Sequence, residues 1–239
     1  MKALGYLFSP RFNALCKEVK KKSKRILTFQ PMSEHPNPHV RDTLGAHIVD
    51  DANICIFLNI DKLKDIKEAE ITAAEDLMYS LMLVEKFPTT FPRQSSDLLA
   101  VIIAGLLTST IHHLTVVSRL QERDFPIEIV EERERKDLLE MLTNDSFREP
   151  QPGTPIFYDL IIGYIKAYFF HESHWSEIQA CFQKRAPIIC SLGDKGIEVV
   201  KRYGCDTPKK CLNTLIDLRD LLGLQQRVFI LNNETGRTF

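Results

Sequence analysis

Hydrophobic residues recur at helical spacing along most of the chain. In residues 71–82 the apolar positions lie three or four residues apart, and this pattern ends before Pro88. Comparable stretches occupy residues 12–26, 97–107, 111–120, 126–142 and 156–170. Two or three further helices are predicted after His171. The pattern therefore predicts an all-α fold, a multi-helix bundle with at most a short strand near the C-terminus.

Two of these stretches, residues 97–107 and 156–170, are apolar almost all round, which predicts helices in the interior of the bundle. A polar break at residues 108–110 (Thr-Ser-Thr) is expected to separate the first of them from the next helix. Residues 54–58 (Ile-Cys-Ile-Phe-Leu) fit a buried strand or a buried helical turn, and we favour a helix because no comparable strand lies nearby. Residues 227–231 fit a short strand or a docked tail.

The composition is that of a soluble globular protein. The chain has 239 residues, of which 44% are apolar and 26% charged, so it can bury a sizeable core. A formal charge of -1 gives no general attraction for nucleic acid. The longest apolar run, residues 98–107, is about half the length of a membrane-spanning helix. Six scattered cysteines without a secretory signal favour reduced thiols and a cytoplasmic location.

Several enzyme signatures are absent from the sequence. It contains no GxxxxGK[ST] phosphate loop, no GxGxxG, no HExxH and no GxSxG elbow. These absences argue against a nucleotide hydrolase, a Rossmann oxidoreductase, a zincin and an α/β-hydrolase. The spacing of His171, His174, Cys181 and Cys190 matches no closed zinc site. We therefore expect no metal site at these four residues.

One predicted helix carries a strongly basic face. Its cationic residues include Lys20, Lys21, Lys22, Lys24 and Arg25. A basic amphipathic helix can bind an anionic membrane or an acidic partner. The solvated face of an ordinary bundle helix has the same composition, so both interpretations stay open.

Asp97 stands out among the charged residues because of its neighbours. It follows a loop that is broken by Pro88 and Pro92, and Ser95 and Ser96 offer hydroxyls to cap the next helix. A carboxylate in a first helical turn is stabilised by unpaired N–H groups, which is a sufficient reason for its presence. The helix after it is so apolar that Asp97 is also expected at the rim of a hydrophobic groove.

The same region resembles the guanine-nucleotide exchange domains of the vacuolar-protein-sorting-nine type, which act on endosomal Rab GTPases. Residues 72–77 (Thr-Ala-Ala-Glu-Asp-Leu) resemble the family's Thr-Pro-x-Glu-Lys-Leu helix start. Residues 95–102 (Ser-Ser-Asp-Leu-Leu-Ala-Val-Ile) resemble its Asp-Asp pair and the apolar helix that follows. Phe157 and Tyr158 resemble its paired tyrosines. The resemblance covers roughly residues 66 to 171.

The resemblance implies a guanine-nucleotide exchange factor that needs no cofactor and forms no covalent bonds in its reaction. Asp97 would enter the nucleotide site of an early endosomal Rab GTPase, compete for its phosphate-loop lysine and disfavour Mg²⁺. Tyr158 would be the second catalytic residue, a hydrogen-bonding group in the groove. The resemblance places five further residues at the partner-binding groove: Leu98, Val101, Ile102, Phe157 and His113.

This interpretation divides the chain into a helical lead-in at residues 1–65, an exchange core at 66–172 and a helical extension at 173–239. Two other functions fit the same sequence: a helical adaptor that binds a partner without releasing nucleotide, and a module that binds a membrane surface. An exchange factor of this kind works in the cytoplasm or on endosomal membranes. The departures from the family pattern suit a distant member, such as a bacterial effector in the host cytosol.

Overall fold

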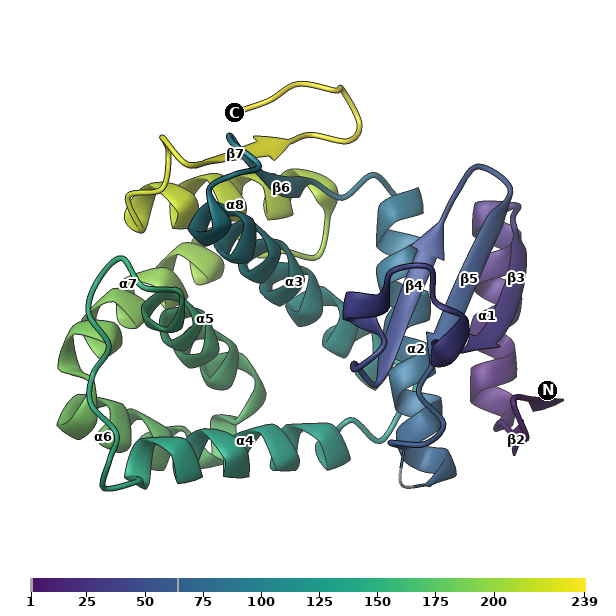
Figure 1. Cartoon of the computed structure of the whole chain (residues 1–239), viewed down its shortest axis with the longest axis horizontal. Helices are drawn as coiled ribbons and strands as arrows, with labels where there is room; N and C mark the ends of the chain where they lie inside the picture. Colours follow the sequence, from purple (N-terminus) through teal and green to yellow (C-terminus); the bar gives the residue numbers. More distant parts are fainter. Residues whose placement is uncertain (1, 64) are drawn as a thin grey trace. The chain divides into compact units, whose positions relative to one another are not determined.

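The computed structural model describes residues 2–63 and 65–239 (Figure 1). The chain forms two compact units. Unit 1 contains residues 1–85 and 116–130, and unit 2 contains residues 86–115 and 131–239.

Unit 1 is built on a three-stranded mixed sheet in the order β3-β5-β4. The central strand β5 (Asn53–Leu58) pairs in parallel with β3 (Ile26–Pro31) and antiparallel with β4 (Gly45–Val49). Ile54, Ile56 and Leu58 of β5 share one face of the sheet and are completely buried. Unit 1 also contains four short elements: the strands β1 (Lys2–Ala3) and β2 (Tyr6–Leu7) and the 3₁₀ turns η1 (Met32–Glu34) and η2 (Pro38–Val40).

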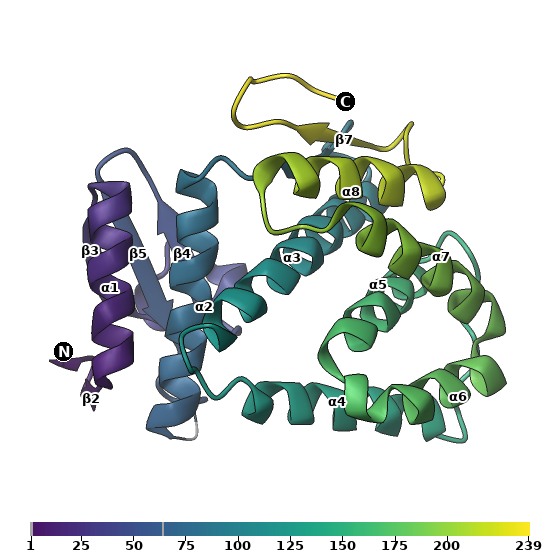
Figure 2. The same cartoon turned by 180° about the vertical axis from the view of Figure 1, so that it is seen from behind.

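Helices α1 (Pro10–Ser23) and α2 (Ile66–Val84) cover one face of this sheet (Figure 2). The hydroxyl of Ser9 caps α1 by accepting the N–H of Phe12 at 3.3 Å, and Lys24 ends the helix in the left-handed region with φ of 58°. The buried residues of α1 are Phe12, Leu15, Cys16 and Val19. Four of the five positions of the predicted apolar stripe are thus confirmed, whereas the fifth, Ile26, lies in β3 and is exposed.

The all-α prediction is wrong, because the fold is mixed α/β with 60% helix and 12% strand. The expected helix at residues 54–58 is the central strand β5. A five-residue apolar run has no readable period, so its structure is decided by its neighbours. The sequence does not identify those neighbours, because residue 26 fits the end of the basic helix and β4 is only half-buried along its whole length.

Unit 2 is mainly helical. Its elements are β6 (Thr89–Pro92), α3 (Leu98–Gln121), α4 (Glu128–Thr143), α5 (Pro155–Phe170), the 3₁₀ turn η3 (Glu172–His174), α6 (Trp175–Arg185), α7 (Pro187–Tyr203), α8 (Pro208–Leu221) and β7 (Val228–Leu231). The last residues of α3 and the first residues of α4 belong to unit 1. Helix α7 packs against α5, α6 and α8, and β6 pairs antiparallel with β7. The predicted helix at 156–170 is thus confirmed, the two or three helices expected after His171 are three, and of the two structures expected for residues 227–231 the strand is present.

The predicted break at residues 108–110 is not present, because α3 runs through it. The hydroxyl of Thr108 accepts the backbone N–H of Thr90 at 2.9 Å and also contacts the Thr90 hydroxyl at 2.6 Å. These polar side chains therefore fasten the β6 strand to α3 instead of ending the helix. By length and composition α3 could also cross a membrane, but 61% of that apolar stretch is buried, as in the core helix of a soluble protein.

Candidate partner-binding face

Asp97 directly precedes α3 and caps it. Its Oδ1 accepts the backbone N–H of Ala100 at 3.1 Å, and its carbonyl oxygen accepts the N–H of Val101 at 3.0 Å. The sequence places the cap at Ser95 or Ser96 and Asp97 inside the first turn, whereas the structure gives the capping role to Asp97 itself. One of the unpaired N–H groups of the helix start is thereby satisfied.

The same carboxylate forms an ion pair with Arg227. The guanidinium Nη1 lies 3.4 Å from Oδ2 of Asp97, and the two side chains are 47% and 28% exposed, respectively. An ion pair this exposed contributes at most about 1 kcal/mol. Both interactions are made within unit 2, to which Asp97 belongs, so Asp97 has a structural role that needs no partner protein.

Replacing Asp97 separates its two roles. We expect Asp97→Ala to lower the free energy of unfolding of unit 2 by about 1 kcal/mol, because the cap is lost. Asp97→Asn keeps a capping oxygen, so we expect a change of only about 0.5 kcal/mol or less. Urea unfolding measures the free energy of unfolding of both variants. It is followed by the fluorescence of Trp175, which is the single tryptophan of the chain and lies in unit 2. Equal destabilisation by Ala and Asn would instead assign the stabilisation to the Arg227 ion pair.

The first turns of α3 expose an apolar surface beside Asp97. Leu98, Val101 and Ile102 are 74%, 41% and 45% exposed, and Gly105 continues the same side of the helix. Nothing lies within 4 Å of the position a Cβ would take on Gly105. We call these four residues the α3 face. The expectation that this helix is buried all round is therefore wrong, since only its other side is covered.

His113 lies about three turns further along the same side of α3 and is half-buried. Its ring meets the ring of Phe170 edge to face, with 5.3 Å between centroids. Burial, with a contribution from Lys166, lowers the pKa of His113 to about 3, so the imidazole is neutral at pH 7. His113 thus contributes to the packing between α3 and α5, and its place in the partner-binding groove stays a prediction.

The predicted aromatic pair sits at the start of α5. Thr154 caps this helix by accepting the N–H of Phe157 at 3.3 Å. Phe157 is only 3% exposed, while Tyr158 is half-buried and meets Phe157 edge to face with 5.5 Å between centroids. Within the described residues, no hydrogen bond links Tyr158 to Asp97. The structure therefore leaves the pairing of these two residues as a prediction.

The chain matches no protein-family model, no curated protein and no solved structure. The likeness to exchange domains consequently rests on the residues quoted above and on nothing else. Within residues 2–63 and 65–239, no three His, Cys, Asp or Glu side chains are arranged to hold a metal ion, and the six cysteines are free thiols.

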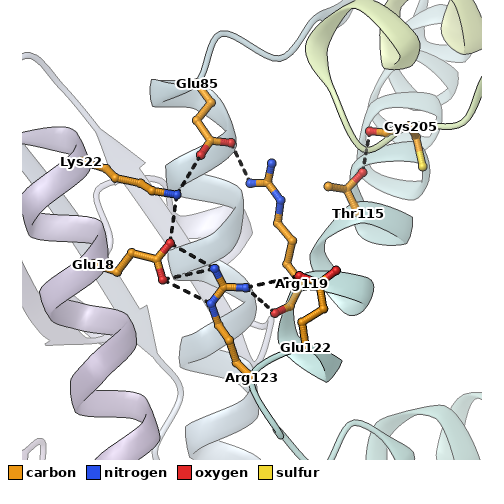
Figure 3. A network of polar contacts seen from close by, with 8 residues as sticks. All are labelled: Glu18, Lys22, Glu85, Thr115, Arg119, Glu122, Arg123 and Cys205. Atoms are coloured by element: carbon orange, nitrogen blue, oxygen red, sulfur yellow. Dashed lines mark hydrogen bonds and ion pairs between the residues drawn. The ribbon is translucent and has the colours of Figure 1, made fainter.

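The basic residues of the N-terminal helix do not act as one surface. Lys22 lies in an ion-pair network of unit 1 that joins α1, α2 and the end of α3 (Figure 3). Its Nζ is 2.9 Å from Glu18 and 3.6 Å from Glu85. The Lys20, Lys21 and Lys24 side chains are exposed, and Arg25 contacts the carbonyl oxygen of Asp51. Because the apolar stripe of α1 is buried in the fold, this helix could meet a membrane only through charge.

Glu18 is the centre of this network. Arg123 binds its carboxylate with two nitrogens, at 3.0 Å from Nη2 and 3.2 Å from Nε (Figure 3). Burial alone would raise the pKa of Glu18, but hydrogen bonds from Arg123 and Lys22 outweigh it and lower the pKa below its ordinary value. A carboxyl of this kind stabilises the fold above its unfolded-state pKa and loses that effect as the pH falls through its folded-state pKa.

We therefore expect Glu18→Gln to destabilise unit 1 by about 1 kcal/mol at neutral pH and by much less once the pH falls below the lowered folded-state pKa of Glu18. Urea unfolding followed by far-ultraviolet circular dichroism measures the difference from the unsubstituted chain at each pH. The fluorescence of Trp175 in unit 2 is the internal control and should not change. A difference that stays the same from neutral to acidic pH would contradict the assigned role of the Glu18 carboxylate.

One group of polar residues was missed by the sequence interpretation. Asp137, Asp159 and His171 line a cleft between α4 and α5 in unit 2. A signal was present, because Asp159 and Lys166 are the only charged residues in the otherwise apolar segment 156–170. Charged side chains on such a helix need a polar environment, and the structure supplies it in this cleft.

Proposed function

We propose that the chain is a protein-binding module that docks a Rab-family small GTPase on the α3 face without releasing its nucleotide. The observation that carries this proposal is the exposure of Leu98, Val101 and Ile102 on one side of one helix. Single exposed apolar residues are ordinary, but a contiguous group is typical of an interaction site. The choice of a small GTPase comes from the resemblance of the sequence, and the choice of docking without catalysis comes from Asp97.

The surroundings of the α3 face suit an apolar partner surface. The exposed residues that precede it, Gln94, Ser95 and Ser96, are uncharged, and Ser109 follows it one turn after Gly105. Gly105 has no side chain, so the backbone of a partner can approach α3 closely there. Asp97 and Arg227 at this end of the helix neutralise each other, and the nearby Arg93 donates to the carbonyl oxygen of Gln225. A partner with an apolar and weakly charged contact surface therefore fits best.

The contacts of Asp97 argue against its entry into a nucleotide site. To reach the phosphate-loop lysine of a GTPase, the carboxylate would have to leave both the N–H of Ala100 and the guanidinium of Arg227. The loss of a cap alone costs about 1 kcal/mol. Contacts with the GTPase would have to offset this free-energy cost in every exchange cycle.

Nucleotide exchange is the second candidate function. It is favoured by the position of Asp97, which is 28% exposed and directly precedes the α3 face at the place where the resemblance implies the inserted carboxylate. The two functions differ in their preferred form of the partner. An exchange factor binds the nucleotide-free GTPase most tightly, whereas a docking module has no such preference.

Binding measurements with early endosomal Rab proteins test the proposal. Each Rab would be prepared with GDP, with a non-hydrolysable GTP analogue and without nucleotide, and titrated with the chain by biolayer interferometry. We expect saturable binding that is no tighter for the nucleotide-free form. Preference for the nucleotide-free form would favour exchange, and no binding to any Rab would overturn both functions. Dimerisation of the chain through the α3 face, detected by sedimentation, would overturn the assigned partner.

A further inference from the structure

A second site lies in unit 2, in the cleft between α4 and α5. Its volume is about 400 Å³, which is within the range of small-molecule sites. One wall is formed by α4 and the other by α5, and Thr110 of α3 also borders the cleft. The lining residues from the two walls are Glu134, Asp137, Leu138 and Met141, and Asp159, Ile162, Gly163, Lys166, Ala167 and His171.

The cleft carries a net negative charge. Three carboxylates line it, and one ammonium group, that of Lys166, neutralises one of them, which leaves a charge of -2. Lys166 is already engaged, because its Nζ lies 2.7 Å from Oε2 of Glu134. Asp137 and Asp159 have no ion-pair partner among the described residues. Both side chains are solvent-exposed at the rim of the cleft, and burial raises the pKa of Asp159 against an opposing contribution from Lys166.

His171 provides a second, independent sign of a ligand. It lines the cleft and is only 8% exposed, yet its ring makes no hydrogen bond with any residue in the described part of the chain. A buried polar side chain normally has a partner. Burial also lowers the pKa of His171, so the ring is neutral at pH 7 and one of its nitrogens can accept a hydrogen bond.

The rest of the cleft is lined by apolar side chains, and there is open space beside Gly163. Leu138, Met141 and Ile162 offer hydrocarbon surface, and nothing lies within 4 Å of the position a Cβ would take on Gly163. The cleft thus combines two free carboxylates, one hydrogen-bond acceptor and an apolar floor. We propose that it binds an organic cation, an ammonium group carried on a short apolar chain. The free alkylamines and the side chain of lysine share this chemistry.

Isothermal titration calorimetry with diaminohexane tests this site in the whole chain. We expect saturable binding that weakens with added salt, and no binding of hexanediol, which has the same chain without the charges. We expect Asp159→Asn and Asp137→Asn each to weaken binding by about tenfold, because each removes a charge-assisted contact. Asp145→Asn is the matched control, since Asp145 is an exposed acid outside the cleft and its replacement should leave the affinity unchanged.

A second variant tests the location of the site without changing any charge. Gly163→Leu would place a side chain in the empty part of the cleft and should abolish binding, while Gly163→Ala adds only a methyl group and should leave the fold intact. NMR signals of the His171 ring should shift on titration and confirm the contact. Nα-acetyl-lysine amide, which keeps the ε-ammonium group, replaces the diamine in a further titration. Tighter binding of this compound assigns the ammonium group to a peptide.

Three results would overturn the proposal. They are no binding of either amine to the folded chain, equal binding of hexanediol, and amine binding that survives both Gly163→Leu and Asp159→Asn. None of these results concerns the α3 face, so the test is independent of the function proposed above.

Discussion

Replacing Gly193 by alanine is expected to lower the free energy of unfolding of unit 2 by about 1–3 kcal/mol. Gly193 lies in α7, where a Cβ would overlap the ring of Tyr164 from α5. That ring is completely buried and cannot move aside, because Trp175 and Phe182 meet it edge to face with 4.9 Å and 4.8 Å between centroids. The added methyl group must therefore push the two helices apart.

The polar end of Tyr164 adds to this constraint. Its hydroxyl donates to Oδ1 of Asp194 at 2.7 Å and lies 3.3 Å from Sγ of Cys190, and burial together with these neighbours raises its pKa well above the ordinary value. A displaced ring would lose the hydrogen bond to Asp194. A buried hydroxyl left without its partner costs additional free energy.

Trp175 fluorescence during urea unfolding measures this effect directly, because the indole ring touches Tyr164. Gly163→Ala in α5 is the matched control, since its Cβ would meet open space. We expect this control to be neutral or up to about 1 kcal/mol more stable, owing to the better helix propensity of alanine. If Gly193→Ala were as stable as Gly163→Ala, the close contact between α5 and α7 would be disproved.

The second large effect concerns the α3 face. We expect Ile102→Asp to weaken binding to a Rab GTPase by about 30-fold or more, because a central apolar contact is replaced by a charge that must lose its water. The stability of unit 2 should change little, since Ile102 is 45% exposed in the free chain. Binding and urea unfolding are measured on the same preparation.

Ile188→Asp is the matched control for this substitution. Ile188 belongs to α7 and is 50% exposed, so the change in side chain and in solvent exposure is nearly the same. Affinity should be unaffected by this variant. If both variants weakened binding equally, the effect would come from the added charge and the α3 face would lose its assignment.

Helices of unit 2 could be predicted from the sequence because their apolar positions repeat over four or more turns. The segment 156–170 is an example, because its apolar run is too long for an ordinary strand, which favours a helix without any knowledge of its neighbours. Strand β5 could not be predicted in this way. Its structure depends on pairing with β3 and β4, and the short patterns of those two strands are typical of several structures.

The candidate site shows a similar division. The sequence identifies Asp97 as the first polar residue of the helix and Leu98, Val101 and Ile102 as its neighbours, and the structure exposes all three apolar side chains. It could not show that Arg227, 130 residues further along, would bind the Asp97 carboxylate. Contacts over such a distance in the chain depend on the tertiary fold. The residues of the α4–α5 cleft were missed for the same reason.

Release of a fluorescent GDP analogue from early endosomal Rab proteins tests the central claim most directly. The chain, Asp97→Asn and Ile102→Asp would each be added in excess to the loaded GTPase, with binding recorded in parallel. We predict that the chain and Asp97→Asn bind the Rab without changing the release rate, while Ile102→Asp does not bind. Accelerated release by the chain that disappears in a folded Asp97→Asn variant would contradict this account and assign catalysis of exchange to Asp97.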